Sequence, residues 1–446
     1  MNILIVSHYI APIQAVASIR WTKIAKYLKK QHEDIHITVI TDEKNFDDKS
    51  SGIPLNKIDP LLSVDVKNFD EVVEVPYGRA YKFYKRKLYL YKVKKNRDIE
   101  YHKNSVDSMG GKKGIKRLLK ETESFLRVDY LENRIIANNI YRNIKNTEKY
   151  DVIISTFSPA WTHLVARRIK KKNNKALWIA DFRDSYADDI ADCPIAFRYH
   201  KKFVKKYCAK ANIVTRVNNE LVLFENINQK VVTVYNGYDL DEKIEKQKSS
   251  KFSFAFTGLL AGDERDFSEL FRVISELIED NTIIPEDVEF YYAGTTGEVF
   301  TNQARKYGME KLVKDYGLVK REEALHIQSK SLFLLMANAN TSTLKCEWSG
   351  KMYEYMMAEK PIIYFVTGTI PYSLPSKNIG KLGGFCYEYL RDEELHVALK
   401  EYISKKYHEW KKNGDVLIDR DMEYIEQFDY SKIADKIWNI IENGRK

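Results

Sequence analysis

The feature that most constrains the fold of this chain is an alternation of strand and helix patterns that occurs twice. In the first half, short apolar runs at 2–7, 35–41, 151–156, 176–181, 212–217 and 231–235 alternate with segments of helical apolar spacing. A second series of apolar runs occupies 252–258, 288–294, 332–338 and 361–366. Strands that alternate with helices at this spacing favour parallel sheets with helices on both faces. We therefore predict two doubly wound α/β modules in tandem.

The domain boundary is predicted where this alternation is interrupted. The length of 446 residues suits two domains rather than one. The turn at 236–239 and the charged run after it lack an apolar period, as linkers do. We expect a first domain over 1–238, a second over 250–418, and a helical C-terminal segment over 419–446.

Cysteine usage and apolar patterning predict a cytoplasmic protein. The four cysteines, Cys193, Cys208, Cys346 and Cys386, are far apart and form no CxxC pair, which favours reduced thiols over a disulfide frame or zinc site. The first residues are typical of a β-strand rather than a signal peptide. No apolar stretch reaches the roughly 20 residues that a membrane-spanning helix needs.

The positive charge of the chain is concentrated in one segment. The formal net charge is +10, and residues 79–120 contain 15 lysines and arginines against three acidic residues. The segment is a solvated charged face, a surface for anionic membranes, or a nucleic-acid surface. We favour the membrane surface because lysines and arginines there are interleaved with tyrosines, and we regard nucleic acid as the least favoured partner. The residues concerned are Tyr84, Lys85, Arg86, Lys87, Tyr89, Tyr91, Lys92, Lys94 and Lys95.

Candidate functional residues follow the strands, because open parallel sheets bind ligands beyond the carboxyl ends of their strands. After the first strand, His8 begins a loop of small residues that ends at Ser18. This loop contains no GxGxxG fingerprint, and the chain contains no GxxxxGK[ST] loop. These absences argue against a nicotinamide dehydrogenase and a P-loop NTPase.

A second group of polar residues follows the strand at 176–181. Asp181, Arg183 and Asp184 place two acids and one arginine at a strand end. Such a cluster is costly to bury without a purpose. It is either a structural Arg–Asp pair that ties loops together or a polar group that holds sugar hydroxyls.

The third group lies at a predicted helix start in the second module. Ser349 and Gly350 precede an amphipathic helix, whose first backbone N–H groups suit a phosphate, and Lys351 adds positive charge there. Glu354, one turn further, is placed to accept hydrogen bonds from a ribose diol. The alternative is an ordinary capped surface helix. Loop residues after two strands of this module complete the candidate donor site: Gly258, Arg265 and Gly294.

These motifs together resemble the family-4 glycosyltransferases of bacterial capsule and O-antigen synthesis, which have the GT-B fold. The most specific piece is 151–189, a strand and helix that lead to the strand end ALWIADFRD. SIRWTKIAKYL, the NGYD turn and SGKMYEYMMAEKPII are also similar to family segments. The resemblance implies an α/β GT-B protein, with two Rossmann-like doubly wound domains that face each other across a cleft.

The resemblance also implies roles for the domains and residues. The first domain would take the acceptor, the second the nucleotide-sugar, and the C-terminal helix would pack back on the first domain. Glu354 matches the ribose-binding glutamate of the family, Gly350 and Lys351 the loop before it, and Arg265 a diphosphate-binding cation. Residues Asp181, Arg183 and Asp184 stand where relatives place a group that serves the reacting sugar or the acceptor.

The sequence departs from the family pattern at several positions. Many relatives have two glutamates separated by seven residues, but here Cys346 stands eight residues before Glu354 and Glu347 is one position out of step. The glycine pair often found in the first loop is missing. The histidine that some relatives use is also absent from the active strand end. His8 and His163 are therefore candidates by position only, and we assign them, with Ser18, to the acceptor loop at the cleft.

We therefore predict a sugar transferase that uses a nucleoside-diphosphate-sugar, without cofactor or metal and with retention at the anomeric carbon. The expected acceptor is a glycan, lipid-linked and part of surface polysaccharide synthesis. The expected location is the cytoplasm, including the inner face of the plasma membrane. Two alternatives stay open: a GT-B-fold sugar-nucleotide epimerase, and a nucleotide-sugar-binding protein without activity.

Overall fold

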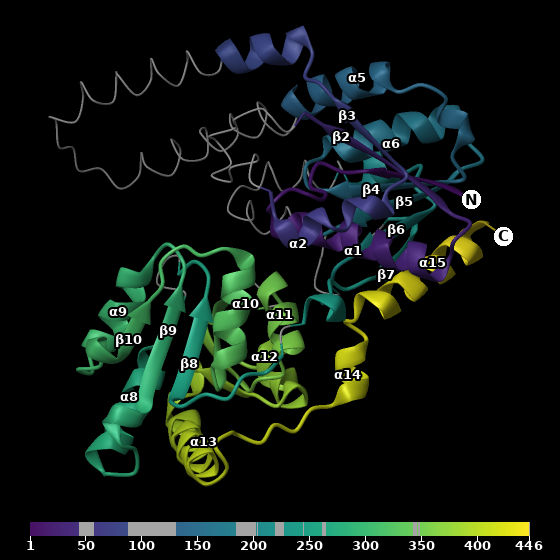
Figure 1. The fold of residues 1–446 in the computed structure, drawn as a ribbon. Helices are drawn as coiled ribbons and strands as arrows, with labels where there is room; N and C mark the ends of the chain where they lie inside the picture. Colours follow the sequence, from purple (N-terminus) through teal and green to yellow (C-terminus); the bar gives the residue numbers. More distant parts are fainter. Residues whose placement is uncertain are drawn as a thin grey trace, which may run out of the picture. The chain divides into compact units, whose positions relative to one another are not determined.

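The computed structural model divides the chain into two compact units (Figure 1). Unit 1 comprises Met1–Tyr235 and Ala434–Lys446, and unit 2 comprises Asn236–Ile433. The structure describes the chain except residues 44–57, 88–130, 184–201, 203, 219–226, 244, 261–264, 342–345, 347 and 446. The segment of helical spacing expected between the predicted strands at 212–217 and 231–235 lies largely outside the described residues.

Unit 1 is built on a seven-stranded parallel sheet with the order β3-β2-β1-β4-β5-β6-β7. Strands β1 and β4 are neighbours in the sheet but are not consecutive in the sequence, and the direction of winding reverses between them. The strands are β1 Asn2–Val6, β2 His36–Asp42, β3 Glu71–Val75, β4 Val152–Phe157, β5 Leu177–Phe182, β6 Ile213–Arg216 and β7 Lys230–Thr233.

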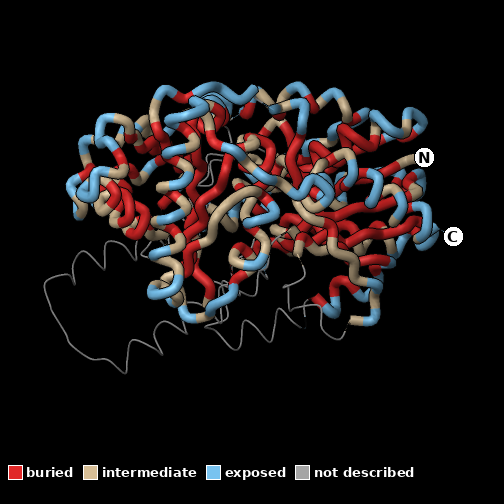
Figure 2. The backbone as a smooth tube through the Cα atoms, turned by 90° about the horizontal axis from the view of Figure 1, so that it is seen from below, coloured by how far each residue is buried: buried red, intermediate tan, exposed pale blue. Residues whose placement is uncertain are grey.

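Helices cover both faces of this sheet, as expected for parallel strands with nearly continuous apolar runs. Figure 1 shows α5 and α6 on one face and α1 with α15 on the other. The strands are buried, whereas the outward turns of the helices and the loops are exposed (Figure 2). The bounds of the helices are α1 Val16–Gln31, α2 Pro60–Ser63, α5 Asn133–Asn143, α6 Trp161–Lys172 and α15 Tyr430–Arg445.

Unit 2 repeats the plan with a six-stranded parallel sheet of order β10-β9-β8-β11-β12-β13, and its winding reverses between β8 and β11. Its strands are β8 Phe252–Thr257, β9 Val288–Ala293, β10 Val313–Asp315, β11 Phe333–Asn340, β12 Ile362–Gly368 and β13 Phe385–Glu388. Its helices are α8 Ser268–Glu279, α9 Gly297–Arg305, α10 Arg321–Lys330, α11 Gly350–Ala358, α12 Leu374–Asn378, α13 Asp392–Asn413 and α14 Met422–Glu426.

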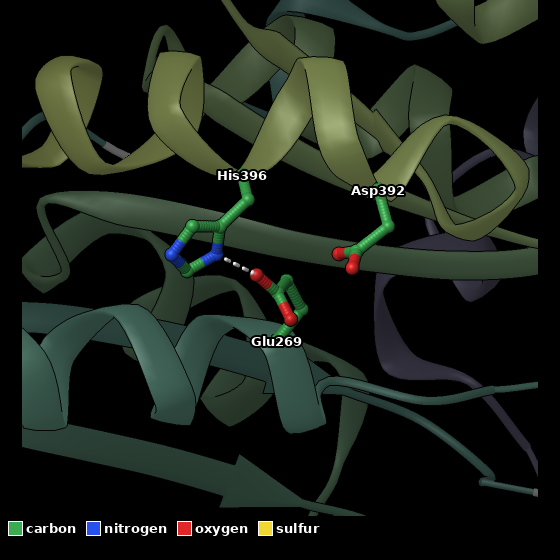
Figure 3. Close-up of side chains that lie close together, drawn as sticks. All are labelled: Glu269, Asp392 and His396. Atoms are coloured by element: carbon green, nitrogen blue, oxygen red, sulfur yellow. Dashed lines mark hydrogen bonds and ion pairs between the residues drawn. The ribbon is translucent and has the colours of Figure 1, made fainter.

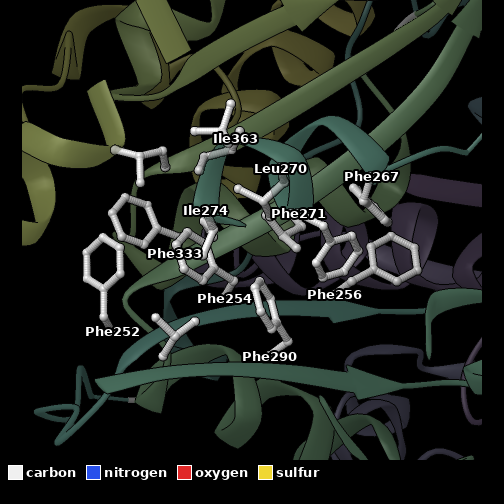
Figure 4. Packing of buried hydrophobic residues seen from close by; sticks show 14 of the residues in the cluster. Phe252, Phe254, Phe256, Phe267, Leu270, Phe271, Ile274, Phe290, Phe333 and Ile363 are labelled. Carbon is white, nitrogen blue, oxygen red and sulfur yellow. The ribbon is translucent and has the colours of Figure 1, made fainter. Parts of the chain in front are cut away.

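The core of unit 2 is rich in phenylalanine (Figure 4). The rings of Phe254 and Phe333 stack at 4.9 Å between centroids, and those of Phe271 and Phe290 meet edge to face at 4.8 Å. Each fully buried phenylalanine stabilises the fold by about 1.5–3 kcal/mol relative to an exposed one. This rigid packing holds the carboxyl ends of the strands in fixed positions, where the candidate site lies.

The C-terminal segment is divided between the two units. Residues from Ala434 onward belong to unit 1, where Trp438 stacks on His32 with 3.6 Å between ring centroids. The return was expected from 419, but residues up to Ile433 belong to unit 2. Aromatic packing explains the difference, because the Phe428 ring packs within unit 2. Its centroid lies 5.6 Å from that of Tyr353 and 5.5 Å from that of Tyr424.

Among the helices that the structure describes, none combines the length and the apolar character needed to cross a membrane.

Candidate functional site

The winding of unit 2 reverses between β8 and β11, and an open parallel sheet forms a crevice beyond its strands at such a point. The loops after β8 and β9 and the start of α11 are close to one another at this edge. Gly258 donates its backbone N–H to Ala293 O at 2.6 Å, and the hydroxyl of Tyr292 donates to Gly258 O at 2.8 Å. The predicted residues Gly258, Gly294 and Lys351 are therefore brought together.

Two positions at this edge require glycine, because neighbouring atoms lie too close for a Cβ. Gly258 has φ +143°, and a Cβ at this position would overlap Nζ of Lys351. A Cβ on Gly294 would overlap Gly258 O and the hydroxyl of Tyr292. A side chain at either position would displace the Lys351 amine or separate the two strand ends.

Lys351 is a partly buried cation at the start of α11. Its Nζ donates to Thr257 O and lies 4.9 Å from the centroid of the Phe256 ring. No carboxylate among the described residues forms an ion pair with it. Burial lowers the pKa of the Lys351 amine to about 8, an effect opposed by Glu354 and reinforced by Arg265. A negatively charged ligand would stabilise the protonated amine.

The start of α11 presents further unsatisfied groups beside Lys351. Ser349 occupies the N-cap position in an extended conformation, and its side chain does not cap the helix. The buried Oγ of Ser349 finds no hydrogen-bond partner among the residues that the structure describes. Gly350 and Lys351 follow as the first helical residues, whose N–H groups have no partner within a helix. Together with the helix dipole, these groups favour an anion.

Arg265 lies in the loop that connects β8 to α8. Its guanidinium donates through Nη1 to Leu259 O, and its own carbonyl accepts from Gln303 Nε2 at 3.1 Å. Residues 261–264 of this loop lie outside the described part of the chain. Arg265 is near enough to Lys351 to influence its pKa, so both predicted cations of the donor site belong to one region.

Glu354 is one turn further along α11, and it is engaged with an arginine that the sequence analysis missed. Arg321 Nε donates to Glu354 Oε1 at 2.9 Å, and Arg321 Nη2 donates to Glu242 Oε2 at 2.7 Å. The two carboxylates raise the pKa of Arg321, although burial alone would lower it. One carboxylate oxygen of Glu354 is thus held in place by Arg321. Arg321 is the first residue of α10, which follows β10 after a short loop. Because candidate residues were sought after each predicted strand, a prediction of β10 would have pointed to Arg321.

Asp181 in unit 1 is fully buried and fully hydrogen-bonded, an arrangement that favours a structural role over contact with a substrate. Its carboxylate accepts from Arg20 Nε at 3.1 Å, Arg20 Nη2 at 2.8 Å, Trp21 Nε1 at 2.7 Å and Thr215 Oγ1 at 2.7 Å. Burial raises the pKa of Asp181, but Arg20 and these hydrogen bonds hold it below its usual range. Arg20 also donates to Val234 O and Tyr235 O at 3.0 and 2.7 Å. The pair therefore ties β5 to α1 and to the end of the sheet.

Arg183 and His8 lie where the first unit reverses its winding. Arg183 Nη2 donates to Ser158 O at 2.8 Å, and its guanidinium lies 4.8 Å from the ring centroid of Tyr9. His8 Nδ1 is 2.7 and 2.8 Å from the two carboxylate oxygens of Asp42. These residues follow β1, β2, β4 and β5 at the carboxyl edge of the sheet. Asp184 lies outside the described residues.

Ser18 and His163 are buried inside unit 1. His163 Nδ1 is 2.7 Å from Ser155 Oγ, which accepts from Trp178 Nε1 at 2.9 Å. Burial lowers the pKa of His163 to about 3, so its ring is neutral near pH 7. Ser18 is 0% exposed, and its Oγ finds no partner within the described residues. Of the three residues predicted for the acceptor loop, His8 is the one that is partly exposed.

The basic segment is described only over 79–87. Lys85 was expected at a membrane surface, but it forms an ion pair with Glu132 at 2.9 Å and is 12% exposed. Tyr84 packs against the apolar core of unit 1. Arg86 and Lys87 are exposed, and the remaining residues of the segment named above, together with Glu347, lie outside the described residues.

A second polar cluster in unit 2 carries donors that a metal ion could use: Glu269 on α8, and Asp392 and His396 on α13 (Figure 3). Arg272 Nη2 lies 2.9 Å from Glu269, 3.3 Å from Asp392 and 2.6 Å from His396 Nδ1. The guanidinium thus occupies the position between the three groups. We interpret the cluster as an ion-pair network that joins α8 to α13.

No protein-family model matches the sequence, and no curated protein sequence matches it either. Solved structures do resemble it. An E. coli structure described as trehalose-6-phosphate bound with UDP-2-fluoro glucose has 11% identity and a TM-score of 0.57, covering 99% of both chains. TarM has 12% identity and a TM-score of 0.56, covering 99% of this chain and 98% of the other.

The lipopolysaccharide outer core galactosyltransferase WaaB has 14% identity and a TM-score of 0.55, covering 98% of this chain and 99% of the other. These structures have the GT-B fold, and they match nearly the whole length of this chain. The chain therefore has the GT-B fold. The predictions of an α/β class and of two Rossmann-like domains are confirmed.

Proposed function

We propose that this chain is a glycosyltransferase that moves a sugar from a nucleoside-diphosphate-sugar to a glycan acceptor. The observation that carries the proposal is that two unsatisfied polar groups lie near each other where the winding of unit 2 reverses, between β8 and β11. Lys351 is partly buried and forms no ion pair with a described carboxylate, and the buried Oγ of Ser349 finds no hydrogen-bond partner among the described residues. A diphosphate supplies a counter-charge for the Lys351 amine and an oxygen that accepts a hydrogen bond from the Ser349 hydroxyl.

The donor-site residues divide the work of binding and leaving-group stabilisation. Lys351 and the start of α11 hold the diphosphate and stabilise the negative charge that develops on it as the sugar departs. Arg265 adds a second cation from the loop after β8. Glu354, oriented by Arg321 at 2.9 Å, accepts hydrogen bonds from the ribose through its carboxylate. The residues that serve this chemistry all come from unit 2.

The acceptor side of the proposal rests on unit 1. His8, oriented by Asp42, and Arg183 provide polar groups at the carboxyl edge for acceptor hydroxyls. Asp184, which directly follows Arg183 in the sequence and lies outside the described residues, is proposed as a further carboxylate for the acceptor. Asp181, Ser18 and His163 support the fold around them rather than touch the acceptor.

We further propose the finer identity that the sequence resemblance implies: a metal-independent, retaining enzyme of family-4 type that acts in capsule or O-antigen synthesis. The acceptor would be lipid-linked, and residues 79–120 would bring the protein to an anionic membrane surface in the cytoplasm. The galactosyltransferase WaaB acts in a lipopolysaccharide outer core, which is consistent with this context. Retention is tested by the anomeric coupling constant of the product in a proton NMR spectrum.

The proposed function is tested by a thermal-shift screen of nucleotide-sugars, because a ligand that binds the native state raises the melting temperature. A stabilising nucleotide-sugar is then incubated with glycan acceptors, and the product is identified by mass spectrometry. We expect Glu354→Gln to raise the donor KM about tenfold, as loss of a hydrogen bond to a charged group does. Glu323→Gln, an exposed change on α10, is the matched control. Full donor affinity in Glu354→Gln would remove this residue from the site.

A sugar-nucleotide epimerase is the second candidate, because a Listeria monocytogenes protein described as a UDP-N-acetylglucosamine 2-epimerase shares the fold at a TM-score of 0.50. An epimerase needs the donor alone. Incubation with a nucleotide-sugar and no acceptor, followed by separation of isomers, distinguishes the two. Binding with neither transfer nor isomerisation would identify a binding protein without activity.

A further inference from the structure

A concave basic surface lies on unit 1 between α5 and α6, and the proposed function does not use it. Its volume is about 480 Å³. Four of its six lining side chains are positively charged and none is acidic; the lining consists of Asn138, Tyr141, Arg142, Arg168, Lys171 and Lys172. We refer to these six residues as the α5–α6 groove.

The α5–α6 groove lies at the opposite edge of the sheet from His8 and Arg183. Helix α6 begins after the carboxyl end of β4 and runs back, so its residues 168–172 reach the amino edge. Helix α5 ends at Asn143, before β4 begins at Val152, and so it ends at the same edge. The groove is therefore distinct from the polar residues at the carboxyl edge of unit 1.

The positive charges in the groove are largely uncompensated. Lys172 pairs with Glu148 at 2.7 Å, but Arg142 and Lys171 have no ion-pair partner among the described residues. Arg168 Nη2 donates to the neutral Oδ1 of Asn138 at 2.5 Å. Partial burial lowers the pKa of Arg168, and the charges of Arg134 and Arg142 lower it further. This arrangement costs free energy in the absence of an anion.

Helix dipoles explain only part of the pattern. Arg142 lies in the last turn of α5, and Lys171 and Lys172 lie in the last turn of α6, where cations are stabilised by the carboxyl end of a helix. Arg168 lies a turn earlier, yet it is oriented by Asn138 from the other helix and lies 5.7 Å from the Tyr141 ring centroid. The two helices thus direct their cations into one concavity.

The shape of the groove favours a discrete anion over a lipid bilayer. A membrane-binding helix presents exposed apolar side chains for insertion. The large hydrophobic residues that are exposed on the described part of unit 1 include none from α5 or α6. Converging arginines and lysines around a recessed tyrosine suit several phosphate groups held close together, since guanidinium groups bind phosphate oxygens in pairs.

We propose that the α5–α6 groove binds a soluble multivalent phosphate, such as the oligophosphate part of a phosphorylated ligand. This site is independent of the donor site in unit 2. Arginines Arg142 and Arg168 contact phosphate oxygens, and Lys171 and Lys172 neutralise the remaining charge. Binding relieves the repulsion between the cations, so the ligand stabilises unit 1.

The test measures binding of tripolyphosphate to the full chain by isothermal titration calorimetry, with Arg142→Ala/Lys171→Ala as the groove variant. Both residues are exposed, so the variant should fold. Lys306→Ala/Lys311→Ala removes two exposed lysines from unit 2 and serves as the matched control. A third variant, Lys351→Met, reports any tripolyphosphate bound at the donor site.

We expect the groove variant to bind tripolyphosphate at least tenfold more weakly, as loss of two charged contacts predicts, and the control to stay within about twofold of the wild type. Without ligand, the melting temperature of the groove variant should equal or exceed that of the wild type, because like charges are removed. Undiminished binding in the groove variant, or loss of all binding in Lys351→Met, would overturn the proposal. A third result would also overturn it: the wild-type protein binds phosphatidylglycerol vesicles, the groove variant does not bind them, and neither protein binds tripolyphosphate. This result would identify a bilayer as the partner.

Discussion

Asp181 in unit 1 and Lys351 in unit 2 are both charged groups at the carboxyl edge of a parallel sheet, but their surroundings are opposite. Asp181 is buried, whereas Lys351 is partly buried. Asp181 accepts four hydrogen bonds, two of them from the guanidinium of Arg20. Lys351 contacts a carbonyl oxygen and an aromatic ring, and it forms no ion pair with a described residue, although the charges of Glu354 and Arg265 shift its pKa in opposite directions. A buried charge that is satisfied within its own unit stabilises the fold, whereas one that lacks a counter-charge is suited to a ligand.

The largest expected effect tests the structural half of this comparison. Asp181→Asn leaves the buried guanidinium of Arg20 without its counter-charge, so we expect the free energy of unfolding to fall by about 3–5 kcal/mol. The measurement is denaturant-induced unfolding followed by circular dichroism. Glu148→Gln, which breaks an exposed pair with Lys172, is the control and should leave the free energy of unfolding nearly unchanged, because water screens an exposed pair. Equal small losses in both variants would show that Asp181 is not structural.

The next effect tests the ligand-binding half. Lys351→Met keeps the length and burial of the side chain but removes its charge, so we expect kcat/KM for the donor to fall about 100-fold, in the range for loss of one preorganised electrostatic contact. Stability should not fall, because a desolvated cation is removed. Steady-state kinetics and thermal unfolding measure the two quantities.

Lys360 provides the matched control for Lys351. Lys360 is buried, its pKa is likewise lowered to about 8 chiefly by burial, and its Nζ donates to Gln247 O at 3.3 Å. It stands two residues before β12 begins at Ile362, at the opposite edge of the sheet. Lys360→Met should leave donor kinetics unchanged. Equal kinetic losses in the two variants would mean that burial of a lysine, rather than its place at the strand ends, explains the effect.

A smaller effect concerns His163, a titratable group buried near Asp181. Its folded pKa of about 3 is below the unfolded value near 6.5, so the unfolded chain binds the proton first as pH falls. The contribution of the neutral His163 ring to the free energy of unfolding is therefore present above about pH 6.5 and is lost as the pH falls toward 3. Between pH 7 and pH 5 we expect the wild type to lose about 2 kcal/mol more than His163→Gln in denaturant unfolding. Parallel pH profiles would contradict the burial of a neutral ring.

The smallest effect sharpens the role of Lys351. Because the pKa of its amine is lowered to about 8, the amine loses its positive charge as pH rises through this value. The kcat/KM for the donor reports ionisations of the free enzyme, so it should decline by about tenfold per pH unit above pH 8. In Lys351→Arg the decline should disappear, since a guanidinium stays protonated. A decline that persists in this variant would assign the ionisation to another group.

Most elements of the fold follow from local patterns, and those that were missed are short. The predicted strands over 252–258 and 288–294 correspond to β8 and β9 within one residue at each end. Strand β10, over Val313–Asp315, has one apolar residue in three, and β13, over Phe385–Glu388, is four residues long. Neither is long enough for a period to be recognised. Because β10 was missed, Arg321 was missed as well.

The sequence by itself determined the class of the fold and the strand ends at which polar groups gather, because the periods of strands and helices are local properties of the chain. It did not determine which charged group is satisfied. Asp181 and Arg20 are 161 positions apart, and Arg321 and Glu354 are 33 apart. Such partners are brought together only when the sheets form. The tertiary structure therefore decided that Asp181 finds its partners within its own unit, while Lys351 forms no ion pair with any carboxylate that the structure describes.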